Sequence, residues 1–448
     1  MSALIGDDRL AETADAALRV GADGILVLAF HSWGGLTRFA SSRIHQNTWR
    51  EDVEFRVMAV VDGNKTGVAT THSLEADDVR RAAEDAVEIA RVTPPDPEFA
   101  GLAPPTQISS IERFDDATAS TAPADRAGAV ATALGEFPAG MEGAGYVETV
   151  SDEVLVINTM GARSYGRTTR AGISVLAMAS DSSGYAERLE GKFASLDPRA
   201  LAEKAVGKAE RSRDPKPIDP GSYTVILEPA ATSTIMQFLG YLGFGAKPFL
   251  EGRSFMTGKL GEQLASELVT IVDDPTAADS LGVPFDFEGT PAKRVALIDK
   301  GVATGVVWDR ATAKKGGTES TGQALPPPNP YGPIPMNLRM EPGQTSLEEM
   351  VASTEHGLLV TRFHYSNVVN EKETLLTGMT RDGTFQIEDG RLVHGVKNLR
   401  YTQNALEALS NVEAVGNQTE ISTELFFGGS RAPALKIRDF KFSSSTTH

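Results

Sequence analysis

Cysteine is absent from the 448 residues of this chain. Without thiols the chain forms no disulfide bond and offers no thiolate to a metal. The first residues also lack a basic region followed by an apolar run, which is the pattern of a secretory signal. No segment approaches the roughly 20 apolar residues of a membrane-spanning helix. The sequence therefore predicts a cytoplasmic protein with no membrane partner.

Positive charge is scarce as well, since 43 Lys and Arg residues stand against 60 Asp and Glu residues. The resulting formal net charge of −17 repels the phosphates of nucleic acids, and no cluster of basic residues offsets it. We therefore expect no nucleic-acid partner. The hydrophobic fraction of 41% is ordinary for a globular protein, and the length allows two or three domains.

Several active-site motifs are missing too. The chain has neither the Gly-x-x-x-x-Gly-Lys-Ser/Thr loop that binds phosphates nor the Gly-x-Ser-x-Gly turn that carries a nucleophilic serine. His356, His364 and His394 lie in the same half of the chain, but no ligand-spacing motif groups them. We therefore expect no metal site built from these histidines.

The elements that are expected divide the chain into three parts. Residues 1–105 and 106–214 each combine helices with strands and are predicted to form two α/β units. The segment 214–221, which contains three prolines, is the clearest boundary, because proline cannot continue the helix before it. Residues 221–442 contain many expected strands joined by hairpin turns. The predicted fold class is α+β, with an α/β N-terminal region followed by a mostly antiparallel, β-rich C-terminal domain.

Capping and turn residues predict some element boundaries. Asp197 is expected to cap a helix that has proline at its first position. Ser73 is expected to cap another helix, whose first turn is acidic. A further helix is predicted over residues 123–137, and separate strands are predicted over 163–167 and 172–180.

One segment, Val225–Gly258, carries most of the functional information. Its sequence VILEPAATSTIMQFLGYL, followed by GFGAKPFLEGRSFMTG, resembles the start of the C-terminal domain in the TldD/PmbA (TldD/TldE) family. Other segments, in matching order and spacing, extend this resemblance to nearly the whole chain. They are Thr37–Asn47, Glu251–Asp274, Phe287–Pro291, and Gly378–Met379 with Ile387–Arg391.

In the metalloprotease branch of that family, a His-Glu-x-x-x-His motif lies on the first helix of this domain. An ungapped alignment over Val225–Gly258 places its His, Glu and His positions on Gln237, Phe238 and Leu242. Zinc needs three protein donors and a base that activates its water, and neither Phe nor Leu can serve. That branch also uses a Cys ligand near the C-terminus, which this chain lacks. The resemblance therefore indicates the PmbA/TldE branch, with no catalytic residue and no metal ligand in this chain.

The resemblance implies a function for such a chain. It would be the non-metal-binding subunit of a heterodimeric metalloprotease, whose TldD-type partner holds the zinc and cleaves peptides or unfolded segments. Two alternatives stay open at this point. One is a metal-free peptide-binding or assembly protein that acts alone or as a homodimer. The other is an autonomous hydrolase with an unrecognised site.

Two segments are candidates for contact with a peptide. In Glu251-Gly-Arg253-Ser254, an arginine beside a glycine can bind a carboxylate or a peptide carbonyl, although a turn with a solvated arginine explains the pattern equally well. The segment 323–335, QALPPPNPYGPIP, is long for a connection and is predicted to be a lid or an interface element. Glu228, by contrast, is predicted to be a helix-start charge that the helix dipole favours.

Overall fold

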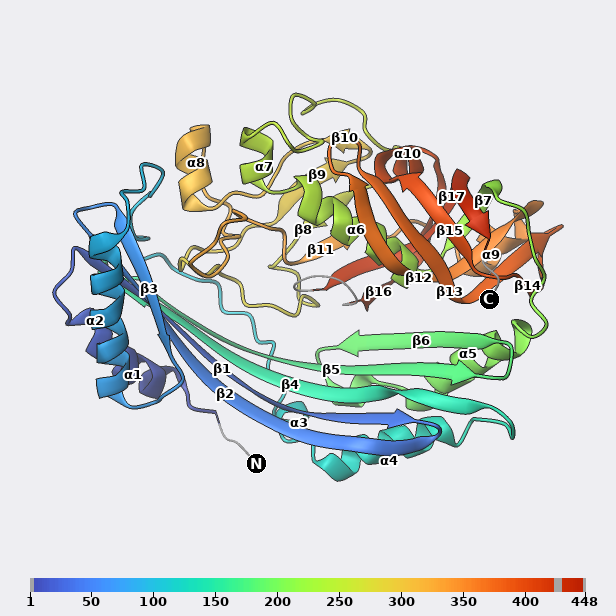
Figure 1. Cartoon of the computed structure of the whole chain (residues 1–448), viewed down its shortest axis with the longest axis horizontal. Coiled ribbons are helices and arrows are strands. Elements are labelled where there is room, and N and C mark those ends of the chain that lie inside the picture. Colours follow the sequence, from blue (N-terminus) through green and yellow to red (C-terminus); the bar gives the residue numbers. More distant parts are fainter. Residues whose placement is uncertain (1–3, 423–428, 446–448) are drawn as a thin grey trace.

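The molecule has two layers, each built on one β-sheet. The structure is a computed structural model that describes residues 4–422 and 429–445. A long, curved sheet forms the lower layer in Figure 1, and the C-terminal domain lies above it. The predicted α+β class is confirmed, because antiparallel strands dominate both sheets and the helices pack outside them.

The first sheet has the strand order β3-β2-β1-β4-β5-β6, and every neighbouring pair is antiparallel. Because β1 pairs with β4, strands from the segments 1–105 and 106–214 join in one continuous sheet. The strands are β1 (Gly24–Ala40), β2 (Arg43–Val61), β3 (Lys65–Thr71), β4 (Glu142–Asn158), β5 (Arg163–Met178) and β6 (Ser183–Glu190).

Helices cover one face of this sheet, the lower face in Figure 1. On β1, Ile25 and Val27 alternate with Leu26 and Leu28, as strand geometry requires. The first pair packs with the N-terminal helices, and the second pair packs with Phe285 of the C-terminal domain. The sheet is therefore buried on both faces at this end. The helices are α1 (Asp7–Leu18), α2 (Ala76–Val92), α3 (Asp116–Ala119), α4 (Pro123–Leu134) and α5 (Pro198–Arg211), with a 3₁₀ turn at Phe193–Ser195.

Some predicted boundaries in this half are wrong. Glu75, not Ser73, is the residue before α2, and the Ser73 hydroxyl accepts a hydrogen bond from the Glu75 N–H instead. The helix predicted over 123–137 ends at Leu134. The two strands predicted over 163–167 and 172–180 form the single strand β5, because the residues between them pair with β4. The predicted cap at Asp197 is confirmed by its hydrogen bond from the Ala200 N–H at 3.0 Å.

The C-terminal domain is built on a mixed sheet of eleven strands in the described residues. Most of its pairings are antiparallel, and β7–β12 and β11–β17 are parallel. The strands are β7 (Gly221–Leu227), β8 (Ile271–Asp273), β9 (Val295–Asp299), β10 (Val302–Ala303), β11 (Leu338–Met340), β12 (His356–Asn370), β13 (Leu375–Glu388), β14 (Arg391–Gly395), β15 (Leu399–Asn404), β16 (Val412–Ser422) and β17 (Ser430–Ser445).

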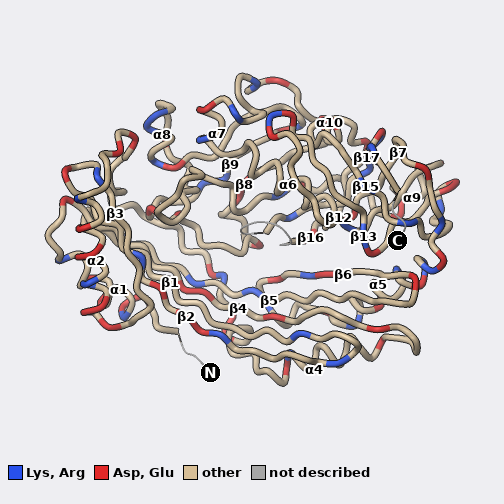
Figure 2. The backbone as a smooth tube through the Cα atoms, in the orientation of Figure 1, with Lys and Arg blue, Asp and Glu red and all other residues tan. Residues whose placement is uncertain are grey.

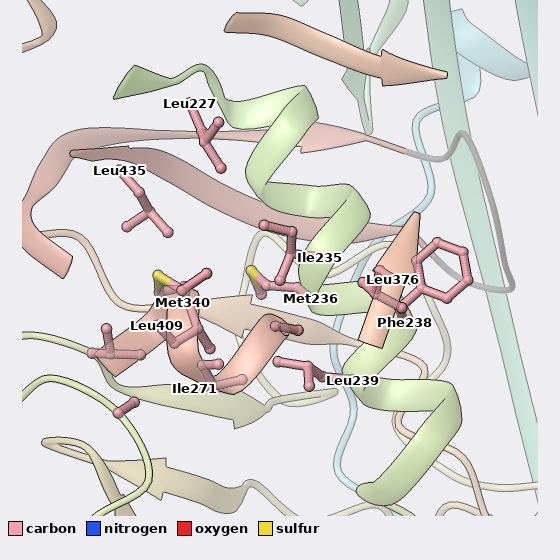
Figure 3. Packing of buried hydrophobic residues seen from close by; sticks show 14 of the residues in the cluster. Leu227, Ile235, Met236, Phe238, Leu239, Ile271, Met340, Leu376, Leu409 and Leu435 are labelled. Carbon is pink, nitrogen blue, oxygen red and sulfur yellow. The ribbon is translucent and has the colours of Figure 1, made fainter. Parts of the chain in front are cut away.

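One long helix, α6, lies against the middle of this sheet and contacts β12, β16 and β17. Its side chains Ile235, Met236 and Leu239 point into the largest apolar core of the molecule, beside Met340 and Leu435 (Figure 3). The other helices of the domain are short. They are α7 (Ala246–Leu250), α8 (Arg310–Gly316), α9 (Leu347–Ala352) and α10 (Ala405–Ser410), whereas α6 spans Pro229–Gly243.

Candidate functional site

Helix α6 carries the positions that the family motif would occupy. Pro229 stands at its first turn, where a missing N–H costs nothing, and Glu228 precedes it. The helix contains no charged residue, as its uniform tan colour in Figure 2 shows. A helix that is apolar on most sides is stable only when it is buried. The core of the C-terminal domain provides that burial.

The three motif positions are all buried, with exposed fractions of 5% for Gln237, 3% for Phe238 and 5% for Leu242. Phe238 and Leu242 belong to the apolar core. The Gln237 amide instead donates hydrogen bonds to the Ser233 hydroxyl at 3.0 Å and to the Ser430 hydroxyl at 3.2 Å. Gln237 therefore joins α6 to β17 through polar contacts inside the domain.

A cavity of about 290 Å³ opens beside this helix, and we call it the α6 cavity. Gln237 and Tyr241 line it from the helix, and Leu338 lines it from β11. Another wall comes from Tyr331, Ile334 and Pro335 of the segment 323–335, which we call the Pro-rich segment. The lining is mainly apolar and aromatic, with few polar groups, as is common in ligand pockets.

The Pro-rich segment 323–335 is held against the helix side of the cavity. Lys247 of α7 donates a hydrogen bond to the Pro330 carbonyl at 2.7 Å. The Pro333 carbonyl comes so close to Gly245 that a Cβ atom there would overlap it. Gly245 is thus required by a close backbone approach. The segment forms a wall of the α6 cavity and of a neighbouring cavity of about 80 Å³.

The two predicted peptide-binding residues lie in different environments. Arg253 is half-exposed, lines the smaller cavity and pairs with Glu251, with Nε 3.0 Å from the carboxylate. Ser254 is buried, and its hydroxyl donates to the Gly243 carbonyl at 2.7 Å and accepts from the Met256 N–H at 2.9 Å. Only Arg253 therefore presents its side chain to a cavity.

Two buried carboxylates anchor the Pro-rich segment, and sequence reasoning missed both. Asp273 accepts hydrogen bonds from the Gln323 side-chain amide at 3.1 Å and from the Asn337 N–H at 2.6 Å, so it holds the first residue of the segment and a residue two positions after its end. Asp286 accepts from the Ala324 N–H at 3.1 Å. Burial raises the pKa of Asp273 to about 7 and that of Asp286 to about 6. The only available signal was a carboxylate placed within otherwise apolar segments.

Glu228 is more than the helix-start charge that the sequence predicts. Its carboxylate is buried and lies 2.6 Å from the Lys208 ammonium of α5 and 3.6 Å from that of Lys204. Burial alone would raise the pKa of Glu228, but the two lysines lower it below its usual value. This ion pair joins the first layer to the start of α6.

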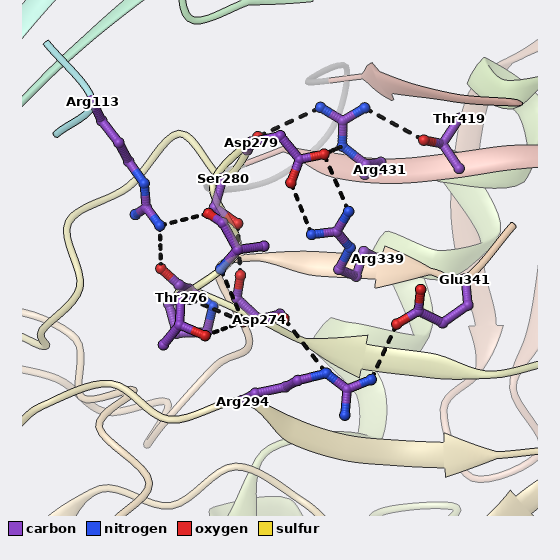
Figure 4. Close-up of polar contacts among 12 residues, drawn as sticks. Arg113, Asp274, Thr276, Asp279, Ser280, Arg294, Arg339, Glu341, Thr419 and Arg431 are labelled. Carbon is purple, nitrogen blue, oxygen red and sulfur yellow. Dashed lines mark hydrogen bonds and ion pairs between the residues drawn. The ribbon is translucent and has the colours of Figure 1, made fainter. Parts of the chain in front are cut away.

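A second contact between the layers places the segment 274–282. Arg113 donates hydrogen bonds to the carbonyls of Pro275 at 2.6 Å and Ala277 at 2.7 Å (Figure 4). In the same segment, the Asp279 carboxylate pairs with Arg339 at 2.9 Å and with Arg431 at 3.1 Å. These contacts fix the loop that faces the first sheet.

Between the layers lies the interdomain cavity, of about 460 Å³. Ser32, Asp152 and Arg170 of the sheet line it on one side, and Val283 and Met336 line it on the other. Arg170 and Asp152 form an ion pair at 2.7 Å. The cavity is polar toward the sheet and apolar toward the C-terminal domain.

A buried histidine beside this cavity was also missed. His31 is 1% exposed, with Nδ1 2.8 Å from Glu153 and Nε2 3.2 Å from Glu51. Burial lowers the pKa of His31, but the hydrogen bonds to both glutamates outweigh it and raise the pKa above its usual value. Glu153 also accepts from the Tyr165 hydroxyl and from the N–H groups of Ile5 and Gly6. The cluster fastens the N-terminal segment to the sheet.

A metal site would need several possible ligand side chains to lie close together in the described part of the chain. Within residues 4–422 and 429–445, no three His, Cys, Asp or Glu side chains are grouped so that they could hold an ion. His356 and His364 lie on β12, and His394 lies on β14. The residues at the motif positions do not fit zinc either, because a phenylalanine and a leucine have no donor atom. In the same residues, no helix combines the length and the hydropathy needed to span a membrane.

Comparison with known proteins defines the class to which this fold and site belong. Three family models match in succession: PmbA/TldA metallopeptidase domain 1 over residues 29–90, the central domain over 105–213 and the C-terminal domain over 220–444. Together they account for most of the chain. This chain belongs to the PmbA/TldD metallopeptidase family.

Individual relatives agree with this assignment. A metalloprotease of Methanothermobacter thermautotrophicus is 29% identical over 66% of this chain, and the match spans 66% of that protein's own length. The metalloprotease PmbA of Escherichia coli O157:H7 is 25% identical over 86% of this chain and 87% of its own length. The crystal structure of TldE from Thermococcus kodakarensis has the same fold, with a TM-score of 0.85 at 21% identity over 97% of this chain and 99% of that one.

Proposed function

We propose that this chain is the non-metal-binding subunit of a heterodimeric TldD/TldE-type metallopeptidase that acts in the cytoplasm on peptides or unfolded segments. One observation carries the proposal. The positions of the zinc motif hold Gln237, Phe238 and Leu242, and two of these side chains are part of the apolar core. A TldD-type partner would then supply the zinc, its water and the base, because this chain has no donor set for them.

In this proposal, the chain contributes shape and contacts rather than chemistry. The α6 cavity has aromatic walls at Tyr241 and Tyr331, which suit an apolar side chain of a peptide. Arg253, at the neighbouring cavity, suits a backbone carbonyl or a carboxylate of the same peptide. The Pro-rich segment would act as a fixed wall, since buried anchors hold both of its ends.

The test is co-purification from the native host with metal analysis of each separated chain. We expect this chain to hold no stoichiometric zinc and to cleave no peptide alone, and we expect peptidase activity when a TldD-type partner is added. About one tightly held zinc per chain, or peptide cleavage by the pure chain, would contradict the proposal.

A metal-free peptide-binding protein is the second candidate, and the α6 cavity favours it. Such a protein would bind peptides with full affinity as a monomer or homodimer, and a TldD-type partner would neither copurify with it nor change that affinity. Size-exclusion chromatography with light scattering, in the presence and absence of the partner, separates this candidate from the first.

A further inference from the structure

Two arginines lie side by side next to the α6 cavity. Arg339 of β11 and Arg431 of β17 are direct neighbours in the parallel pairing of these strands. Each side chain is only 18% exposed. Like charges on neighbouring strands repel one another, and burial increases the cost. Two arginine side chains thus lie together in a largely buried position, although the chain as a whole has a net charge of −17.

One carboxylate is shared between the two cations. Asp279 receives both Nη groups of Arg339, at 2.9 and 3.2 Å, and the Nε of Arg431 at 3.1 Å. Among the described residues, the Nη groups of Arg431 make only long contacts, 3.4 Å to the Thr419 hydroxyl and 3.5 Å to the Asp279 carbonyl. Figure 4 shows both arginines directed at Asp279. These three side chains sum to one positive charge, Arg188 and Glu190 of β6 are further charges that act on Arg431, and Arg431 keeps donor capacity.

The two arginines line a small pocket of about 20 Å³, which we call the arginine pocket. A water-sized group needs roughly 10–15 Å³, so the pocket has room for about one such group, for example a single carboxylate oxygen. Leu338 and Gly429 line both this pocket and the α6 cavity, so the two spaces are adjacent. An apolar cavity thus continues into a pocket lined by two arginines and the Asp279 carboxylate that they share.

We propose that the arginine pocket binds a carboxylate of a peptide whose neighbouring apolar side chain occupies the α6 cavity. A guanidinium donates charge-assisted hydrogen bonds to a carboxylate oxygen, and a partly buried position strengthens such bonds. The carboxylate has two possible sources, the C-terminus of the peptide and an Asp or Glu side chain. The inference rests on the proposed peptide-handling function, and it adds the chemical class that this subunit selects.

The test measures peptide binding to the full chain without any partner. Fluorescence anisotropy follows labelled peptides of the sequence Gly-Gly-Ala-Phe with a free C-terminus, the same peptide as its C-terminal amide, and an amidated peptide with Glu after the Phe. We expect the free acid or the Glu peptide to bind about tenfold more tightly than the plain amide. Whichever acid binds more tightly identifies the source.

Substitutions assign the effect to the pocket. Arg431→Gln should remove the preference for the acid, and Arg431→Lys should keep part of it, because the charge stays and the fork geometry is lost. Arg294→Gln is the matched control. Arg294 also pairs with carboxylates, Asp274 at 3.5 Å and Glu341 at 3.1 Å, but it lines none of these cavities. It should leave the preference unchanged.

Three results would overturn the inference: equal binding of acid and amide, a preference that survives Arg431→Gln, or no binding of any of the peptides. Thermal melts of each variant show whether it is folded. If Arg431→Gln unfolds, Arg431→Lys replaces it, and a preference as strong as that of the parent would then overturn the inference. None of these results bears on zinc content or on cleavage with a partner, so the proposed function is tested separately.

Discussion

The two walls of the α6 cavity are built in opposite ways. Helix α6 is held by apolar packing along nearly its whole length, and its polar contacts are few. The Pro-rich segment has little apolar core of its own and is held at its ends by buried carboxylates, Asp273 and Asp286. The first wall should therefore resist any change of polarity. The second should tolerate changes of sequence between its anchors and respond to pH.

The largest effect should follow from writing the zinc motif into the first wall. The triple change Gln237→His, Phe238→Glu and Leu242→His places a carboxylate and an imidazole in the apolar core. Loss of a buried Phe typically costs about 3–5 kcal/mol, and an unpaired buried charge adds several more. We expect the variant to unfold or to lose most of its stability without gaining tight zinc binding.

Chemical denaturation and zinc titration of the triple variant decide this prediction. Tyr241→His is the matched control, because Tyr241 lies on the same helix but is 42% exposed. It should change the free energy of unfolding by less than about 1 kcal/mol. A triple variant as stable as the parent, with zinc bound tightly, would mean that α6 tolerates polarity and that the contrast between the walls is false.

A smaller loss should follow when the ion pair at the start of α6 is broken. Glu228→Gln leaves the buried Lys208 ammonium without its carboxylate at 2.6 Å. Removing one partner of a buried pair costs about 3–5 kcal/mol. The double variant Glu228→Gln with Lys208→Met should recover part of this loss, since no buried charge is then unpaired. Urea denaturation measures both, and a double variant weaker than the single one would refute the argument.

The anchoring of the Pro-rich segment should make the stability of the protein depend on pH. Asp273 binds its proton more tightly in the folded state, where its pKa is about 7, than in the unfolded state. The contribution of Asp273 to the free energy of unfolding is therefore fully present below about pH 4 and is lost as the pH rises to about 7. Over that range we expect a loss on the order of 1–3 kcal/mol in the free energy of unfolding.

Asp273→Asn should flatten that part of the pH profile. The Asn oxygen can still accept from the Asn337 N–H. Its amide group would face the Gln323 Nε2, which is also a donor, so the Gln323 side-chain amide must turn and present its Oε1, an atom without a hydrogen-bond partner among the described residues. Denaturation curves from pH 4 to pH 8 provide the measurement, with Asp286→Asn as a second carboxylate variant. A variant with the same slope as the parent would show that Asp273 is not the titrating anchor.

The smallest effect concerns the contact between the two walls. Gly245→Ala places a methyl group against the Pro333 carbonyl and should displace the Pro-rich segment, at a cost of about 1–2 kcal/mol. Gly128→Ala in α4 is the control, because its Cβ meets nothing and should stabilise by roughly 0.5–1 kcal/mol. Hydrogen exchange of residues 330–335 should rise only in the first variant. If hydrogen exchange of residues 330–335 were unchanged in Gly245→Ala, the contact between Gly245 and the Pro333 carbonyl would not hold the Pro-rich segment in place.

Sequence reasoning succeeded where a local rule was sufficient. The cap at Asp197 depends on one side chain and its own helix, and the α+β class depends on the order of the elements. Sequence reasoning failed where a strand or a side chain pairs with residues that are distant in the sequence. The single strand β5 forms because β4 pairs along its whole length, and no local pattern contains that information. The role of Asp273 likewise depends on residues 50 and 64 positions away.

The sequence by itself determined that this chain has the framework of a PmbA/TldD family protein and that the zinc-motif positions hold Gln, Phe and Leu, because both follow from residue identities along the chain. Only the tertiary structure decided which of those side chains enter the core and which one borders a cavity. It also brought Arg339 and Arg431 together from segments 92 residues apart. Strand pairing creates such neighbours, and a pairing between distant strands is set by the packing of the whole domain.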